Sequence, residues 1–210
     1  MTRSRQQIRL GRELCLALVL FLMPHEGWTQ SPAPEGASDS PEVLLGDFWI
    51  DRYEYPNIAG HMPQVDVSWE EASQLCIDGG KRLCTEIEWE RAARGTENFD
   101  FGYGPEFEAQ RCNTPSPDGD RWKRNNGTVP AGGFENCSTP TGVHDLIGNV
   151  WEWTEGWYDR QAGWRPVRGG SWFHNVNFAR ADGHFGHYLT ADYRLDLIGF
   201  RCCRPATQQE

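Results

Sequence analysis

The clearest hydrophobic pattern in the chain lies at residues 150–154, where apolar and polar positions alternate. Trp151 and Trp153 fall on one face of the predicted strand, and Glu152 falls on the other face. A period of two is typical of a strand. The preceding residues 145–149 include aspartate, glycine and asparagine, which are turn formers. The pattern therefore predicts a turn that leads into a strand with one aromatic face.

Two helices are predicted from their N-terminal signals. Ser68 is followed three residues later by Glu71, and Thr85 is followed in the same way by Glu88. In such a capping box the hydroxyl and the carboxylate each bond a free backbone N–H at the start of a helix. Glycines follow both segments and are expected to end the helices: Gly79 and Gly80 for the first, Gly95 for the second.

The N-terminal residues predict an export signal. Four arginines precede a ten-residue apolar run at 14–23, and polar residues follow it. The run is short for a membrane span, so we expect residues 1–30 to be a cleaved signal peptide, with an uncleaved anchor as the alternative. Residues 31–42 are rich in Pro, Ser, Gly and Ala and predict a disordered, dispensable linker. Residues 43–210 then form one domain.

Charge and cysteine content narrow the expected environment and partners. The chain has 30 acidic and 20 basic residues, a formal net charge of −10. Such a balance provides no basic surface for nucleic acid, or for a membrane once the signal is removed. Of the seven cysteines, six lie beyond Cys15 in the leader. Six cysteines in an exported chain favour disulfides and a secreted, periplasmic or otherwise extracytoplasmic location, but fifteen pairings are open.

Four motifs, in the right order, resemble the formylglycine-generating enzyme (sulfatase-modifying factor) family. The motifs lie at 81–95, 142–153, 168–171 and 197–204. The resemblance runs from about residue 46 to residue 205. It implies the family's irregular α+β fold, which is related to C-type lectins and has two helices, short strands and many loops.

The resemblance also implies one disulfide, in which Cys76 on the first helix pairs with Cys202 on the closing strand. On that strand Cys203 points to the opposite face from Cys202. Because Cys84 follows the first helix closely, we expect Cys84 to pair with Cys203. The third disulfide then joins the two cysteines that remain beyond the leader: Cys112 and Cys137.

A calcium site at the central turn is a further implication of the resemblance. Its ligands would be the carbonyls of Asp145, Gly148 and Val150 and the carboxylate of Glu152. Water would complete the oxygen shell that calcium prefers. From the residues alone, the alternative is a glycine turn that opens a buried strand, with Glu152 simply solvated.

The resemblance breaks at the copper site of the active members. In members that form formylglycine, two cysteines five residues apart follow the Arg-Gly-Gly-Ser motif. Their thiolates hold copper(I), which activates oxygen to oxidise a substrate cysteine. The corresponding positions in this sequence are His174 and Ala179. The family's oxidation therefore cannot run by its known mechanism, and no catalytic residue is assigned.

Two functions therefore compete. One is a formylglycine-generating-type oxidoreductase with a rebuilt copper or iron site at His174, to which His184 and His187 could contribute. The other is an exported, calcium-stabilised and non-catalytic module that binds a peptide, a protein or a glycan in the family's cleft. The residues expected to line that cleft are Trp151, Ser171, Trp172, His174 and Arg180.

Overall fold

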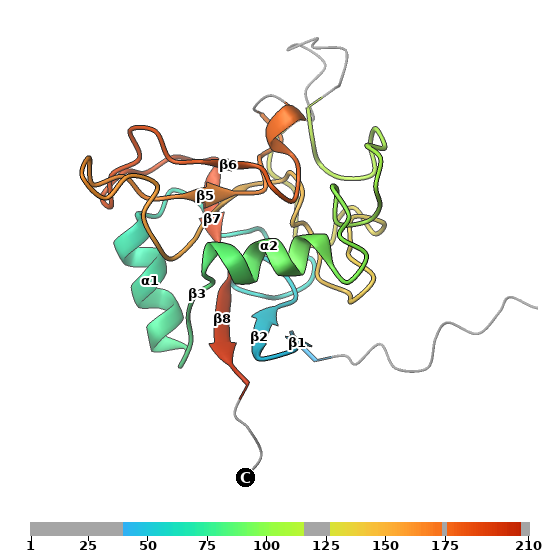
Figure 1. The fold of residues 1–210 in the computed structure, drawn as a ribbon, viewed down its shortest axis with the longest axis horizontal. Coiled ribbons are helices and arrows are strands. Elements are labelled where there is room, and N and C mark those ends of the chain that lie inside the picture. The colour runs from blue at the N-terminus through green and yellow to red at the C-terminus, as the bar shows by residue number, and fades with distance from the viewer. Residues whose placement is uncertain (1–39, 116–126, 174–175, 207–210) are drawn as a thin grey trace, which may run out of the picture. The chain divides into compact units, whose positions relative to one another are not determined.

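The computed structural model describes residues 40–115, 127–173 and 176–206 (Figure 1). The predicted signal peptide, most of the predicted linker and His174 lie outside the described residues. Within the described ranges, no helix is long and apolar enough to cross a membrane.

Short elements and long connecting loops make up the described fold. The helices are α1 (Trp69–Asp78) and α2 (Glu86–Arg94), and a 3₁₀ turn covers Val176–Phe178. The strands are β1 (Glu42–Leu45), β2 (Phe48–Asp51), β3 (Arg82–Leu83), β4 (Trp151–Trp153), β5 (Val167–Arg168), β6 (His184–Phe185), β7 (Ile198–Phe200) and β8 (Cys202–Pro205).

Both helices begin where the capping boxes predict. The Ser68 hydroxyl accepts the backbone N–H of Glu71 at 3.1 Å, and the Glu71 carboxylate accepts the N–H of Ser68 at 3.0 Å. Thr85 and Glu88 form the same reciprocal pair at the start of α2. Gly95 ends α2 with a φ of 60°, a conformation that favours glycine. The two predicted helices are confirmed.

Two four-stranded sheets meet at Arg201. The first sheet has the order β1-β2-β8-β3 and is antiparallel. The second has the order β6-β5-β4-β7, in which β4 pairs antiparallel with β5 and parallel with β7. Arg201 is the single residue between β7 and β8, so the chain passes from one sheet to the other at this point.

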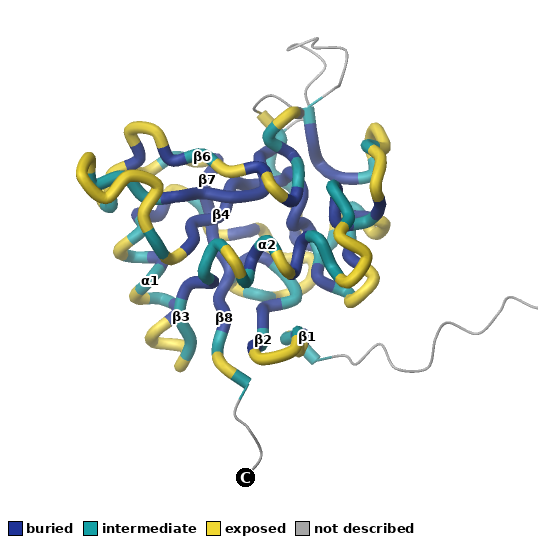
Figure 2. The backbone as a smooth tube through the Cα atoms, viewed as in Figure 1, coloured by how far each residue is buried: buried dark blue, intermediate teal, exposed yellow. Residues whose placement is uncertain are grey.

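The interior is built around large aromatic side chains. Figure 2 shows the buried segments of the backbone in dark blue. Trp89 from α2 and Trp153 from β4 are completely buried, and the Trp153 indole N–H donates to the Val67 carbonyl at 3.0 Å. All three residues of β4 are buried, because β5 and β7 flank the strand and side chains cover both of its faces. The central strand is therefore a core strand and not a half-exposed one.

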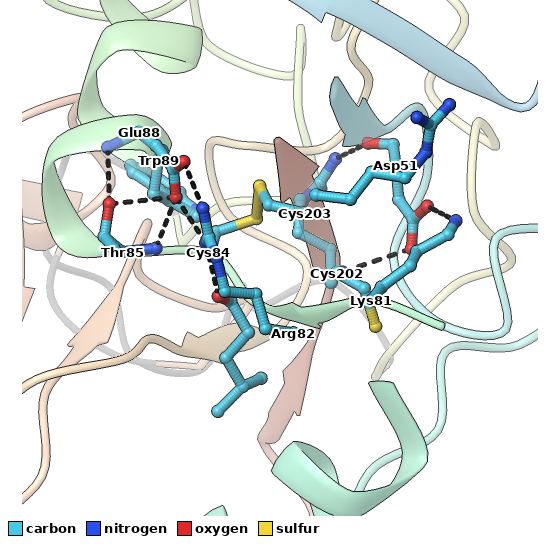
Figure 3. The surroundings of a disulfide bond; sticks show 12 residues. Asp51, Lys81, Arg82, Cys84, Thr85, Glu88, Trp89, Cys202 and Cys203 are labelled. Atoms are coloured by element: carbon cyan, nitrogen blue, oxygen red, sulfur yellow. Dashed lines mark hydrogen bonds and ion pairs between the residues drawn. A yellow bond between two sulfur atoms is a disulfide. The ribbon is translucent and has the colours of Figure 1, made fainter. Parts of the chain in front are cut away.

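Three disulfides tie the loops and elements together. The structure contains all three of the expected pairs, and Figure 3 shows the surroundings of Cys84–Cys203. Two of them anchor neighbouring residues of β8, one to α1 and the other to the loop before α2. The pairs and their sequence separations are Cys76–Cys202 with 126 residues, Cys84–Cys203 with 119 and Cys112–Cys137 with 25.

The fold starts earlier than the predicted end of the linker. Glu42 belongs to β1, and its carboxylate accepts from Arg204 Nε at 2.9 Å and pairs with Lys81 Nζ at 3.2 Å. The Pro41 carbonyl accepts the backbone N–H of Arg52 at 2.9 Å. The predicted C-terminal boundary of the linker at residue 42 is therefore wrong. Pro41 and Glu42 belong to the folded domain, because they supply backbone and charged partners to the first sheet.

A shortened chain tests this boundary. A chain that starts at Val43 is expected to be about 1–2 kcal/mol less stable than one that starts at Ala37, because it lacks the Glu42 carboxylate between two cations. Thermal unfolding of both chains measures the loss, and Glu42→Gln in the longer chain should reproduce part of it. Identical melting temperatures would show that the contacts of residues 40–42 contribute nothing.

Candidate functional site

The carboxylate of Glu152 on β4 lies at the centre of a buried ion pair. It accepts the Arg201 guanidinium twice, from Nε at 2.7 Å and from Nη2 at 2.7 Å. The indole N–H of Trp89 donates to the same carboxylate at 2.7 Å. Glu152 is 1% exposed and Arg201 is 0% exposed. The bidentate pair therefore joins the central motif to the β7–β8 junction, and the Trp89 indole bond joins both to helix α2.

Arg201 is held by further acceptors, which fix its orientation. Its Nη1 donates to the Asp51 carbonyl at 3.1 Å, and its Nη2 donates to the His144 carbonyl at 2.8 Å. Burial alone would lower the pKa of Arg201, but the surrounding carboxylates, Glu152 first and then Glu54 and Asp145, together raise the pKa. The guanidinium therefore stays charged inside the core, and it satisfies one carbonyl at the end of β2 and another in the loop before β4, which are far apart in the sequence.

This geometry does not fit the expected calcium ligand at Glu152. Both oxygens of the carboxylate already accept charge-assisted or indole hydrogen bonds. A divalent cation on the same carboxylate would lie beside the Arg201 guanidinium and would be repelled by it. The alternative of a simply solvated Glu152 is wrong, because the side chain is buried. The calcium site itself stays a prediction. Glu152 serves here as a structural counter-ion.

A chain of buried polar groups adjoins the ion pair. Glu54 Oε2 accepts from Asn149 Nδ2 at 2.8 Å, and Asn149 Oδ1 accepts from Asn113 Nδ2 at 2.8 Å. The Asp145 carboxylate accepts the Gly132 N–H at 2.6 Å. Sequence reasoning missed Glu54, which lies just after β2 and is fully buried. Glu54 follows the aromatic residues of the first predicted strand, and nothing in the sequence near it indicates that the loop at 145–149 packs against it.

Burial and mutual repulsion hold protons on this cluster. Burial, followed by repulsion from Asp145 and Glu152, raises the pKa of Glu54 well above its ordinary value. Burial raises the pKa of Asp145 to about 6, although the Gly132 N–H opposes the shift. Three carboxylates thus share one arginine, and protons compensate part of the excess negative charge.

The raised pKa of Asp145 predicts a pH-dependent stability. A carboxyl whose folded pKa is raised stabilises the fold below its unfolded pKa near 4, and that stabilisation is lost as the pH rises through about 6. Relative to wild type, Asp145→Asn is therefore expected to become more stable as the pH is raised from 4 to 7. Melting temperatures of both proteins across this range measure the difference. A difference that does not change with pH would contradict the assignment.

The residues expected to line the cleft do not form one open surface. Trp151 is 3% exposed and Ser171 is 1% exposed, so neither can line an open cleft. Trp172 is half-buried and donates its indole N–H to the Thr128 hydroxyl at 3.2 Å. Arg180 is half-buried and pairs with two aspartates. Trp151 instead lines an apolar cavity of about 120 Å³, together with Phe178, Phe185 and Leu189.

Comparison with known proteins identifies the family. Residues 36–206 match the sulfatase-modifying factor enzyme 1-like domain. The chain belongs to this family. It is 37% identical over 158 residues to the inactive C-alpha-formylglycine-generating enzyme 2 of Bos taurus, which covers 69% of this chain and 50% of that protein. It is 36% identical over 104 residues to the formylglycine-generating enzyme of Thermomonospora curvata, and the match covers 46% of this chain and 34% of that protein. The chain thus spans half or less of these relatives.

Solved structures confirm the expected α+β fold of the family, which is related to C-type lectins. PvdO from Pseudomonas aeruginosa superposes with a TM-score of 0.58 and 22% identity over 76% of this chain and 80% of that chain. CarF superposes with a TM-score of 0.61 and 20% identity, over 76% and 86% of the chains. At these identities the likeness concerns the fold alone.

Of the two positions that hold the copper-binding cysteines in active family members, the structure describes only Ala179. Ala179 is 1% exposed and packs against Gly170 so closely that a Cβ on the glycine would lie 2.9 Å from the Ala179 nitrogen. His184 packs on Tyr158, with ring centroids 5.7 Å apart, and His187 packs on Trp164 at 4.4 Å. Among the described residues, no three His, Cys, Asp or Glu side chains come together in a group that could hold a metal.

Proposed function

We propose that this family member is an exported, non-catalytic module that binds a peptide, a protein or a glycan. The observation that carries the proposal is Ala179, a buried methyl group at the position of one copper-binding thiolate. Copper(I) in this family needs two thiolates, because a soft cation prefers soft ligands. An alanine cannot supply one, and the other position is His174.

The remaining cysteines do not offer a replacement for the missing pair. All six cysteines beyond the leader are joined in disulfides, and a disulfide sulfur is not a thiolate ligand. The similarity to the protein named inactive C-alpha-formylglycine-generating enzyme 2, in cattle and in mouse, supports the same conclusion.

Export is supported by the chemistry of the same cysteines. Three disulfides in one small domain are typical of an oxidising compartment, and the apolar run at 14–23 resembles an export signal. We therefore place the domain outside the cytoplasm. Calcium is not part of this proposal, because the only carboxylate among the expected ligands is used by Arg201 and Trp89.

An activity assay tests the non-catalytic role. The wild-type protein, supplied with copper(I) and oxygen, is expected to form no aldehyde on a cysteine-containing sulfatase peptide, as read by mass spectrometry. The double variant His174→Cys with Ala179→Cys is expected to gain copper(I) binding, because it restores two thiolates. The single variant His174→Cys is the matched control and should bind copper(I) far more weakly. Aldehyde formation by the wild-type protein would overturn the proposal.

Metal analysis separates the proposal from an oxidoreductase with a rebuilt site. A binding module is expected to purify without stoichiometric copper or iron. One equivalent of either metal, lost on His174→Ala, would establish a redox site at that residue and would exclude the non-catalytic role.

A further inference from the structure

An apolar cavity lies on the aromatic face of the central strand β4. Each of the four strands of the second sheet supplies one side chain to its wall, and the 3₁₀ turn and the loop between β6 and β7 supply the others. The cavity has a volume of about 120 Å³. We call it the β4 cavity, and its described lining residues are Trp151, Val167, Phe178, Phe185, Leu189, Tyr193, Leu195 and Ile198.

The strand register explains why these side chains meet. Trp151 is paired with Ile198 across β4 and β7, and Val167 is paired with Phe185 across β5 and β6. Val167 is also paired with Trp153, which lies on the same face of β4 as Trp151. Paired residues of neighbouring strands have their side chains on one face of a sheet. The wall of the cavity is therefore fixed by the core of the sheet, in which β4 and β7 are buried throughout (Figure 2).

The chemistry of the lining favours a hydrocarbon group as the ligand. Six of the eight described lining side chains have no polar atom, and the other two have one each, the indole nitrogen of Trp151 and the hydroxyl of Tyr193. A buried water needs about two to four polar partners, whereas apolar cavities stay dry and bind apolar molecules. The hydroxyls of a sugar ring would lose their hydrogen bonds with water and would find few partners in this cavity. Of the ligand classes proposed above, the cavity therefore suits a peptide or protein and not a glycan.

The volume of the cavity limits the size of the group that can enter it. An apolar cavity of about 150 Å³ holds benzene, which has six carbon atoms. By proportion, the 120 Å³ of the β4 cavity hold about five carbon atoms. The side chains of leucine and isoleucine have four carbon atoms and fit, whereas that of phenylalanine has seven and does not. The cavity therefore matches one aliphatic side chain.

The exposure of the lining residues shows where a ligand enters. Tyr193 is 37% exposed, the side chains of Phe178, Phe185 and Leu195 are half-buried, and the remaining lining residues are buried. Solvent therefore reaches the cavity from the side of Tyr193, and a side chain can enter there while its main chain stays outside. Burying about five carbon atoms supports a dissociation constant on the order of millimolar, so a free hydrocarbon would bind weakly. A peptide adds contacts around the entrance and uses the inserted side chain as an anchor.

We infer that the β4 cavity is the binding pocket for one leucine or isoleucine side chain of a peptide ligand. This inference rests on the proposed binding role and names the class of ligand and its anchor. It assigns Trp151, which was expected to line an open cleft, to the wall of this pocket.

Methyl NMR of the full chain tests the pocket, because methyl groups of Val167, Leu189 and Ile198 line it. The probes are cyclopentane and the peptides Gly-Gly-Leu-Gly-Gly and Gly-Gly-Ala-Gly-Gly, with each peptide at about 5 mM, above the dissociation constant expected for the anchor alone. A shift of these methyl signals with the leucine peptide, and not with the alanine peptide, is the expected result. A shift with cyclopentane alone would overturn the peptide assignment, and equal shifts with both peptides, or none with any probe, would overturn the pocket.

Two substitutions at Leu195 test the size of the pocket. Leu195→Trp fills it and is expected to abolish the response to the leucine peptide, while the melting temperature stays equal or rises because empty space is filled. Leu195→Ala enlarges it and is expected to gain a response to Gly-Gly-Phe-Gly-Gly that the wild type lacks. Leu44→Trp is the matched control, because Leu44 is 48% exposed on β1 of the first sheet and the response should not change.

An unchanged response of Leu195→Trp to the leucine peptide would overturn the inference. A wild-type response to the phenylalanine peptide that equals the response to the leucine peptide would also overturn it. The aldehyde assay separates this pocket from the proposed function. Aldehyde formation together with a leucine response would overturn only the non-catalytic role, and the absence of both would overturn only the pocket.

Discussion

Replacing Arg201 by methionine is expected to lower the free energy of unfolding by about 3–5 kcal/mol. The substitution keeps much of the side-chain volume but leaves Glu152 buried as an unpaired carboxylate, with only the Trp89 indole as a donor. It also removes the donors to the carbonyls of Asp51 and His144. Urea unfolding of the variant and the wild type measures the loss, which is a large fraction of the stability of a domain of this size.

Arg194→Met is the matched control for this prediction. Arg194 also pairs with a glutamate, Glu71, but both side chains are nearly half exposed and solvent screens the pair, so the expected loss is far smaller than at Arg201. Equal losses at Arg194 and Arg201 would contradict the assigned role of burial.

Urea unfolding of Glu152→Gln and the wild type, in the presence of calcium and in the presence of a chelator, tests the role of Glu152. If the carboxylate is a counter-ion for Arg201, the loss from Glu152→Gln is the same in both solutions. A loss that appears only in the presence of calcium would show that Glu152 is a calcium ligand and would contradict the ion-pair assignment.

Short-range signals in the sequence made the two helices predictable. A capping box involves residues three apart, so Ser68 with Glu71 and Thr85 with Glu88 contain the whole interaction in sequence. Among the disulfides, Cys76–Cys202 was implied by the family resemblance, Cys84–Cys203 then followed because neighbouring residues of a strand face opposite sides, and Cys112–Cys137 was the pair that remained.

The role of Glu152 was not predictable, because its partners are distant in sequence. Trp89 is 63 residues away and Arg201 is 49 residues away. The alternation at 150–154 shows which side chains share a face, but it does not show that strands on either side and helix α2 cover both faces. Trp151 and Ser171 were expected to line the family's cleft, and they are buried instead.

The largest expected loss of stability comes from removing two disulfides together. Cys76–Cys202 and Cys84–Cys203 overlap in sequence, and their half-cystines are eight residues apart at one end and adjacent at the other. With either disulfide intact, the other closes an effective ring of only about ten residues, worth about 2.5–3 kcal/mol in the chain-entropy description. Removing both also opens the loop of 119 residues, which is worth about 5 kcal/mol more.

Three variants measured by urea unfolding test this dependence of one disulfide on the other: Cys76→Ala with Cys202→Ala, Cys84→Ala with Cys203→Ala, and all four substitutions together. The free energy of unfolding should fall by about 3 kcal/mol in each variant that lacks one disulfide and by about 7–8 kcal/mol in the variant that lacks both. The combined loss therefore exceeds the sum of the two single losses by about 2 kcal/mol. Because the double-mutant cycle cancels the packing cost of each cystine, the excess reports the loop alone. Removing Cys112–Cys137 in place of either overlapping disulfide provides the additive control, since its loop of 25 residues has neither end near theirs. Strict additivity of the two overlapping disulfides would show that the unfolded chain does not gain the freedom that opening the long loop predicts.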